Sequence, residues 1–197
     1  MRGVNDEGSP VLLLASGSPR RRELLAALGA RFEVRPAEVD ERPLEDEEPR
    51  AMAARLAAAK ARTVARQRPD ALVLAADTVV IVDGTVLGKP RDAEENRRFL
   101  RALGGIDHTV VTAHHLSREG QERTVSVATE VRLRRLGEEE IDRWVARGAG
   151  LDKAGGYAIQ DLGAALVAEL RGCYTNVVGM SLPAVIREAA RLGAPLV

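Results

Sequence analysis

The sequence predicts a mixed α/β fold built on a central sheet that is not purely parallel. In the first half of the chain, short apolar runs typical of buried strands alternate with helical segments, as they do in parallel sheets. In the second half a hairpin pattern interrupts this alternation and adds antiparallel strands. The length of 197 residues, 45% of them hydrophobic and 29% charged, fits one globular domain or two lobes that share a cleft.

The first predicted elements are a strand, a tight loop and a helix. The apolar run 11–15 predicts a buried strand, and residues 20–28 predict a helix. Ser18 is suited to cap that helix and Pro19 to its first position. Gly29 suits the left-handed conformation that often follows a helix end. A helix N-terminus should therefore lie directly after the first strand.

The rest of the first half contains two more strands and one helix. Residues 32–34 predict a short strand, and the apolar run 71–82 predicts a long one that ends at a turn, 83–84. Residues 38–48 include seven acidic residues, which is typical of a solvated loop. The alanine-rich segment 50–66 predicts a helix.

The second half is predicted to hold a capped helix, a hairpin and several shorter elements. Asp92 and Glu95 form a capping box for a helix that runs to Leu103. Residues 109–116 and 124–136 form the hairpin. The remaining elements, in chain order, are a helix at 138–147, a glycine-rich loop at 149–163, short strands at 164–169 and 174–178, and a closing helix at 183–192.

Composition excludes several classes of function. Lysine plus arginine number 29, as do aspartate plus glutamate, so no basic surplus is available for nucleic acid or an anionic membrane. No apolar run reaches the roughly 18 residues of a membrane span. The polar start lacks a signal-peptide core, and a lone Cys173 excludes an internal disulfide. We expect a flexible tail at 1–10, a single domain at 11–197 and a cytoplasmic location.

The start of the first helix has the chemistry of an anion site. Backbone N–H groups and the helix dipole favour a bound anion there. Ser16 and Ser18 add hydroxyl donors, and Arg20 and Arg21 add guanidinium groups that bind phosphate oxygens in pairs. The spacing is not that of a P-loop. The alternative is a capped surface helix coated with arginine.

Asp77 is the second candidate, because it interrupts an apolar strand. A carboxylate there costs free energy unless it is paired, hydrogen-bonded or bound to a metal. At a strand end it would serve as a Mg²⁺ ligand or a general base; otherwise it is an exposed residue at a bend between two strands. Lys89, on a stiff Gly-Lys-Pro turn, adds a cation. The glycine-rich loop 152–160 either approaches a ligand or is only a turn.

The histidines and serines show no pattern for other chemistry. His108, His114 and His115 lack metal-ligand spacing, and the last two fit ordinary strand positions. No serine has the context of a nucleophile elbow. A histidine metal site and a Ser-His-Asp hydrolase are therefore not expected.

Five sequence blocks resemble the Maf-like nucleoside triphosphate pyrophosphatases and follow that family's order. Leu-Ala-Ser-Gly-Ser-Pro-Arg-Arg-Arg-Glu-Leu-Leu at 14–25 is similar to the N-terminal signature, and Ala-Ala-Asp-Thr-Val-Val at 75–80 to the catalytic segment. The other blocks are Leu-Gly-Lys-Pro-Arg-Asp at 87–92, Asp-Lys-Ala-Gly-Gly-Tyr-Ala-Ile-Gln at 152–160 and Asn-Val-Val-Gly-Met-Ser-Leu-Pro at 176–183. The resemblance extends over nearly the whole chain.

The resemblance implies an elongated mixed sheet with flanking helices in two lobes around a cleft, as in inosine triphosphate pyrophosphatases. It also implies that a homodimer hydrolyses a nucleoside triphosphate to the monophosphate and pyrophosphate, with Mg²⁺ or Mn²⁺. Asp77 would be the proton acceptor and would hold the metal with Glu41, although Asp40 could exchange roles with Glu41. The implied substrate contacts are Ser16, Ser18, Arg20, Arg21, Lys60, Thr78, Lys89, Lys153 and Gln160.

The loop 152–160 is similar to that of the branch acting on dTTP, UTP and some modified pyrimidine nucleotides. A sister branch acting on 7-methyl-GTP carries Glu in place of Gln160 and lacks Lys153. Asp161 departs from the pattern, because Gly is common there and the extra carboxylate would lie close to a polyanion. The non-enzymatic alternative is a nucleotide-binding regulator of septum formation, which would not need Asp77.

Overall fold

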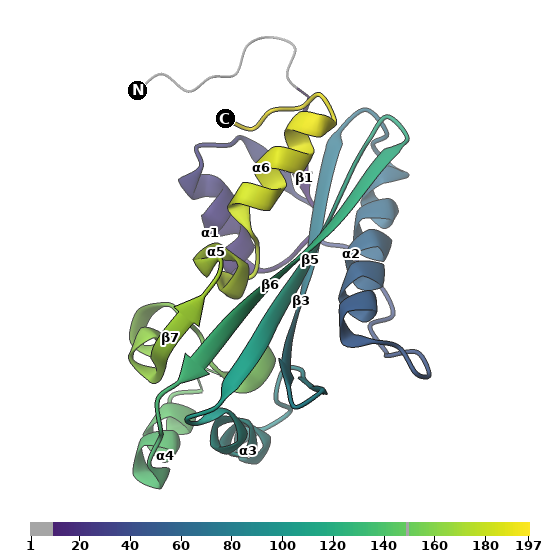
Figure 1. The fold of residues 1–197 in the computed structure, drawn as a ribbon. Helices are drawn as coiled ribbons and strands as arrows, with labels where there is room; N and C mark the ends of the chain where they lie inside the picture. The colour runs from purple at the N-terminus through teal and green to yellow at the C-terminus, as the bar shows by residue number, and fades with distance from the viewer. Residues whose placement is uncertain (1–9, 149) are drawn as a thin grey trace. The chain divides into compact units, whose positions relative to one another are not determined.

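The computed structural model describes residues 10–148 and 150–197 (Figure 1). The chain divides into two compact units. The first comprises the described residues up to Asp77, Thr112–Val127 and Gly179–Val197; the second comprises Thr78–Val111 and the described part of Ala128–Val178.

The predicted tail at 1–10 lies outside the described residues apart from Pro10. Among the helices that are described, none combines the length and the apolar character needed to cross a membrane.

The first unit contains a parallel arrangement of strands. β1 (Leu12–Leu14) pairs in parallel with β2 (Phe32–Val34) and with the first part of β3 (Leu72–Val82). Parallel neighbours need crossover connections, and the helices α1 (Pro19–Ala27) and α2 (Pro49–Ala65) lie in these connections. A further helix, α6 (Leu182–Arg191), follows near the end of the chain.

Side chains of β1 and β3 alternate between two hydrophobic clusters. Leu12 and Leu72 pack in one cluster with Leu25 of α1. Leu13 packs in the other with Ala61 of α2. Successive side chains of a strand point to opposite faces, so a strand covered on both faces must be apolar throughout. This requirement explains the continuous apolar runs in the sequence.

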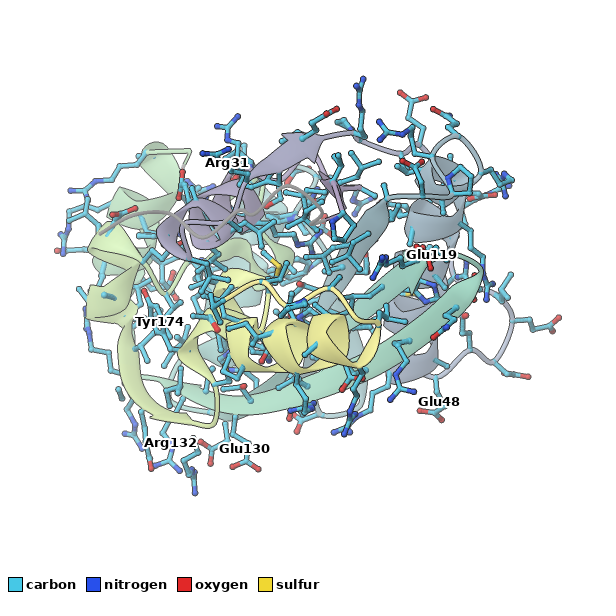
Figure 2. All side chains as sticks on the ribbon, turned by 90° about the horizontal axis from the view of Figure 1, so that it is seen from above. Arg31, Glu48, Glu119, Glu130, Arg132 and Tyr174 are labelled. Carbon is cyan, nitrogen blue, oxygen red and sulfur yellow. The ribbon has the colours of Figure 1, made fainter. Side chains whose placement is uncertain are left out.

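The second unit has its own core and its own elements. Leu100, Trp144 and Tyr157 belong to that core. Along the strand that follows the hairpin turn, buried Val131 alternates with Glu130, which points outward (Figure 2). The elements of this unit include β4 (Thr85–Leu87), α3 (Ala93–Leu103), α4 (Glu138–Ala146), β7 (Val167–Arg171) and α5 (Tyr174–Val178).

The strands form one seven-stranded sheet in the order β2-β1-β3-β5-β6-β7, with β4 paired to β3. β5 (Asp107–Arg118) and β6 (Gln121–Leu133) are the predicted hairpin. Its two turn residues, Glu119 and Gly120, both have positive φ (51° and 77°), as a tight hairpin turn requires. β6 and β7 are antiparallel. The predicted mixed α/β sheet with flanking helices is confirmed.

One predicted strand is wrong and another begins later in the chain than predicted, and tertiary contacts explain both differences. Residues 174–178 form helix α5, in which the amide of Asn176 donates to the carbonyl of Val110 and to Thr129 Oγ1, both at 3.1 Å. Residues 161–166 form a 3₁₀ helix, and strand β7 begins only where Val167 pairs with Leu133. Fixed partners outweigh local strand propensity at both places.

The predicted helix caps differ in their details. Ser18 precedes α1, but its side chain makes no capping hydrogen bond; its backbone N–H donates to Ser16 Oγ at 3.3 Å. Asp92 caps α3, accepting from the Glu95 N–H at 2.8 Å. The Glu95 carboxylate accepts from the Arg91 N–H rather than completing the box.

The buried histidines His114 and His108 are held neutral. Nε2 of His114 accepts a hydrogen bond from the Ser181 N–H at 2.8 Å, which requires that this nitrogen carry no proton. Burial is the main cause that lowers the pKa of His114 to about 4. Burial likewise lowers the pKa of His108, in the second unit, to about 4.

These histidines should make stability depend on pH. In the unfolded chain a histidine has a pKa of about 6.5, so between pH 6.5 and 4 the unfolded state binds protons that the folded state excludes. The contribution of each neutral histidine to the free energy of unfolding is complete above pH 6.5. It decreases as the pH is lowered, by about 2 kcal/mol per histidine between pH 6.5 and 5. Urea unfolding at pH 7.5 and pH 5 measures this loss. Between these two pH values the variant His114→Gln should lose less stability than the wild type, by the contribution of one histidine. The same pH dependence in the variant and the wild type would contradict this explanation.

Candidate active site

Arg21 connects the loop after β1 to the part of β3 that belongs to the first unit. Its Nη1 donates to Ser16 Oγ at 3.0 Å and to the Ala76 carbonyl at 2.7 Å. Its Nε donates to the Gly179 carbonyl at 2.9 Å. Burial lowers the pKa of Arg21, and the Asp77 carboxylate opposes this shift. One planar guanidinium therefore joins three chain segments that lie far apart in the sequence.

Asp77 lies in the middle of β3 and is paired, not exposed at a bend. Its Oδ1 accepts a hydrogen bond from Lys60 Nζ at 2.7 Å. Lys60 comes from α2 and is only 9% exposed. The same Nζ lies 2.6 Å from Glu41 Oε1. One ammonium group therefore bridges two carboxylates from different elements.

The acidic loop before α2 presents Glu41, and not Asp40, to this pair. Asp40 forms an ion pair with Arg42 at 2.5 Å, and hydrogen bonds from Arg42 lower the pKa of Asp40. Glu41 reaches Lys60 although its own side chain is 60% exposed. The structure therefore separates two neighbours that the sequence left interchangeable.

The predicted site residues fall into two groups, one in each unit. Ser18 and Arg20 lie at the start of α1, and the charge of Arg20 lowers the pKa of its neighbour Arg21. The other residues of the first-unit group are Ser16, Arg21, Glu41, Lys60 and Asp77, and the second-unit group is Thr78, Lys89, Lys153 and Gln160.

In the second unit a backbone hydrogen bond connects the two predicted binding segments. The Gly155 N–H donates to the Gly88 carbonyl at 3.0 Å, so the loop 152–160 lies beside the turn that carries Lys89. Lys89 is exposed and forms no ion pair with the described residues. Lys153 pairs with Asp152, and Gln160 precedes the 3₁₀ helix 161–166. Asp161 is exposed and has a positive φ of 52°, the conformation for which Gly is the usual choice.

The donor set around Asp77 fits a divalent cation bound together with a nucleotide. The carboxylates of Asp77 and Glu41 already converge on one positive charge, the Lys60 ammonium. Mg²⁺ is commonly held by one or two carboxylates plus substrate phosphates. The described residues contain no group of three or more His, Cys, Asp or Glu that could hold a metal ion, so substrate phosphates would have to complete its ligands.

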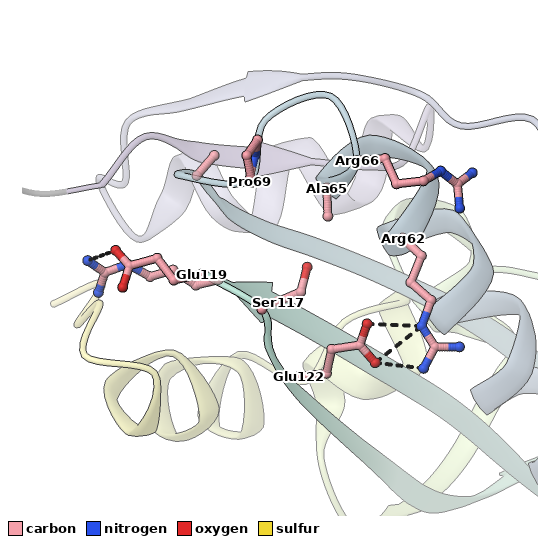
Figure 3. Close-up of a pocket in the computed structure, with 10 residues that line it drawn as sticks. Arg62, Ala65, Arg66, Pro69, Ser117, Glu119 and Glu122 are labelled. Atoms are coloured by element: carbon pink, nitrogen blue, oxygen red, sulfur yellow. Dashed lines mark hydrogen bonds and ion pairs between the residues drawn. The ribbon is translucent and has the colours of Figure 1, made fainter.

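A separate cavity of about 320 Å³ in the first unit lacks this chemistry (Figure 3). α2, the segment between α2 and β3, and the β5–β6 hairpin form its walls. Its charges are largely engaged: the Arg62 guanidinium pairs with Glu122 at 2.6 Å, and Arg118 pairs with Glu119 at 3.1 Å. We do not assign the cavity to a triphosphate.

Several contacts that build these groups could not be predicted from residue type. Arg21 uses the backbone carbonyls of Ala76 and Gly179, and carbonyl acceptors leave no trace in residue type. Asn96 and Trp144 both donate to the Gly156 carbonyl in the glycine-rich loop. A lone tryptophan on an apolar helix face predicts only core packing.

Fold and site together define a class of protein: a mixed α/β protein with paired carboxylates and clustered cations suited to an anionic substrate. A family model described as Maf-like protein matches residues 11–192, and the chain belongs to this family.

Curated relatives agree with that assignment, and one solved structure shares the fold. A protein of Anaeromyxobacter dehalogenans named dTTP/UTP pyrophosphatase is 53% identical over 95% of this chain and 97% of its own length. One from Thermomicrobium roseum with the same name is 49% identical over 94% of this chain and 85% of its own. A HAM1 protein from Coxiella burnetii shares the fold, with a TM-score of 0.53 and 15% identity over 93% of this chain and 98% of its own.

The role of Arg21 as a clamp can be tested with Arg21→Lys. Lysine keeps the charge but loses the fork that serves Ser16, Ala76 and Gly179 together. We expect the free energy of unfolding to fall by about 1–3 kcal/mol, measured by urea denaturation. Arg22→Lys, at the exposed next position of the same helix, is the matched control and should change stability by less than about 0.5 kcal/mol. Equal stability of the two variants would refute the clamp.

Proposed function

We propose that this protein is a cytoplasmic, homodimeric pyrophosphatase that hydrolyses dTTP, UTP and related modified pyrimidine nucleotides to the monophosphate and pyrophosphate. The observation that carries the proposal is Lys60 bridging Asp77 and Glu41, with Arg21 binding the carbonyl next to Asp77. The names of the relatives support the same reaction and substrates.

The cations suit the triphosphate chain. Arg20 and the N-terminus of α1 supply positive potential and donors for phosphate oxygens. Lys89 and Lys153 supply further ammonium groups from the second unit. Pyrophosphate leaves with additional negative charge, so cations near the β- and γ-phosphates favour its departure.

Asp77 is the proposed general base. Its carboxylate accepts a proton from a water molecule as the water oxygen attacks the α-phosphorus. The bond between the α-phosphorus and the oxygen that bridges to the β-phosphorus then breaks, and pyrophosphate takes the electron pair. Lys60, hydrogen-bonded to Oδ1 of Asp77, orients the carboxylate for this step.

Asp77 and Glu41 would also hold Mg²⁺ or Mn²⁺. A divalent cation bound there would supply Lewis-acid stabilisation of the negative charge that develops on the phosphate oxygens.

Gln160 is the proposed base-reading residue, with Thr78 as a further contact. A side-chain amide offers both a donor and an acceptor, which matches the mixed donor and acceptor edge of uracil and thymine. The carboxylate of Asp161 follows directly in the sequence and should disfavour phosphate close to Gln160.

Product analysis tests the proposal. Purified protein with Mg²⁺ or Mn²⁺ is incubated with dTTP, UTP, CTP, GTP and 7-methyl-GTP. Monophosphate and pyrophosphate should form from dTTP and UTP. Turnover of 7-methyl-GTP alone would keep the reaction and overturn the assigned substrates. Binding without turnover of any nucleotide would favour a regulator.

Removing the base should abolish turnover without unfolding the protein. Asp77→Asn keeps the side-chain volume but removes the proton acceptor, so we expect kcat to fall by a factor of about 10² to 10⁴. Circular dichroism checks the fold. Asp70→Asn, on the exposed turn before β3, is the matched control and should retain full activity. A folded Asp77→Asn variant with near-normal kcat would rule out this role.

A further inference from the structure

The glycine-rich loop of the second unit is held by side chains from three other elements. Both the Asn96 amide of α3 and the Trp144 indole N–H of α4 donate to the Gly156 carbonyl, at 2.8 Å and 3.1 Å. A carbonyl oxygen has two lone pairs, so these donors saturate it. His108 of β5 contacts the next residue of the loop, because its Nε2 lies 2.7 Å from the Tyr157 hydroxyl oxygen.

Steric limits show that the loop is built to fit these partners. A Cβ on Gly156 would lie 2.0 Å from the Asn96 amide nitrogen, and a Cβ on Gly150 would lie 2.2 Å from the Gly156 carbonyl oxygen. Gly156 also has a positive φ of 72°. No side chain can occupy either position without displacing the Asn96–Gly156 contact.

The chain on both sides of Gln160 is fixed in the same way. Ile159 is buried, and the Gly163 N–H donates to the Gln160 carbonyl at 3.0 Å. A Cβ on Gly163 would meet the Ala158 carbonyl oxygen at 2.1 Å. Gln160 itself is half-buried. Its backbone is held by the buried Ile159 on one side and by the Gly163 N–H on the other.

We propose that Asn96, Trp144 and His108 are positioning residues that hold the loop 152–160 and thereby set the selectivity of Gln160 among nucleotide bases. The inference rests on the proposed function, in which Gln160 reads the base. None of the three residues touches the substrate in this account; they act through the Gly156 carbonyl and the Tyr157 hydroxyl.

The main test uses Trp144→Phe, which keeps an aromatic ring and removes one donor to Gly156. The preference for dTTP over CTP, measured as the ratio of kcat/KM values, should fall about 3- to 10-fold, the loss typical of one buried hydrogen bond. KM for dTTP should rise with kcat nearly unchanged, because base binding contributes equally to ground and transition states. Tyr157→Phe, which removes the hydroxyl that meets His108, should act in the same direction.

A double-mutant comparison separates positioning from general stability. In a Gln160→Ala background, Trp144→Phe should have no further effect on the dTTP/CTP ratio, because the residue through which it acts is gone. Val131→Ala, in the same core on β6, controls for lost stability and should leave the ratio unchanged. Hydrogen–deuterium exchange of residues 152–160 should quicken in Trp144→Phe but not in Val131→Ala.

The outcomes distinguish the inference from the proposed function. If the wild-type protein turns over dTTP while Trp144→Phe and Tyr157→Phe keep its base preference, the positioning role is wrong and the function stands. Additive effects of Trp144→Phe and Gln160→Ala on the ratio would also refute it. If the wild-type protein hydrolyses no nucleotide, the proposed function fails and the inference fails with it.

Discussion

The need to neutralise a carboxylate inside an apolar strand governs the site. Asp77 follows five consecutive residues of β3 that are buried, and its charge would be costly there without a partner. Lys60 meets that need at 2.7 Å, and Lys60 in turn could not remain 9% exposed without an anion. Removing Lys60 would leave the Asp77 carboxylate without its paired ammonium group, whereas removing Asp77 would leave Lys60 paired with Glu41. The position of α2 along β3 is therefore tied to this ion pair, and Glu41 joins it from the preceding loop.

Backbone carbonyls provide the second means of holding the functional segments. In the first unit Arg21 binds the carbonyls of Ala76 and Gly179 and so locks the Ser16 loop. In the second unit the roles are reversed, because two side chains converge on the single carbonyl of Gly156. The second arrangement needs close backbone approach, because a Cβ on Gly156 would lie 2.0 Å from the Asn96 amide nitrogen.

The sequence predicted most of the fold because apolar periodicity and turn residues carry that information locally. The strand–loop–helix start, the Asp92 cap and the hairpin at Glu119-Gly120 were all readable in this way. The strand expected at 174–178 is a helix and the one expected at 164–169 begins at Val167, since Asn176 and the β6–β7 register depend on residues far away in the sequence. For the site, residue type and family resemblance pointed to Asp77 and Lys60, but their mutual contact and the choice of Glu41 over Asp40 required three-dimensional coordinates.

The most direct test of the central claim is to follow the oxygen of the attacking water. Hydrolysis of dTTP in water enriched in ¹⁸O, followed by mass spectrometry of both products, identifies the phosphorus that is attacked. We expect one ¹⁸O atom in the monophosphate and none in the pyrophosphate, because Asp77 activates water for attack on the α-phosphorus. Label in the pyrophosphate, or release of orthophosphate in place of pyrophosphate, would contradict it.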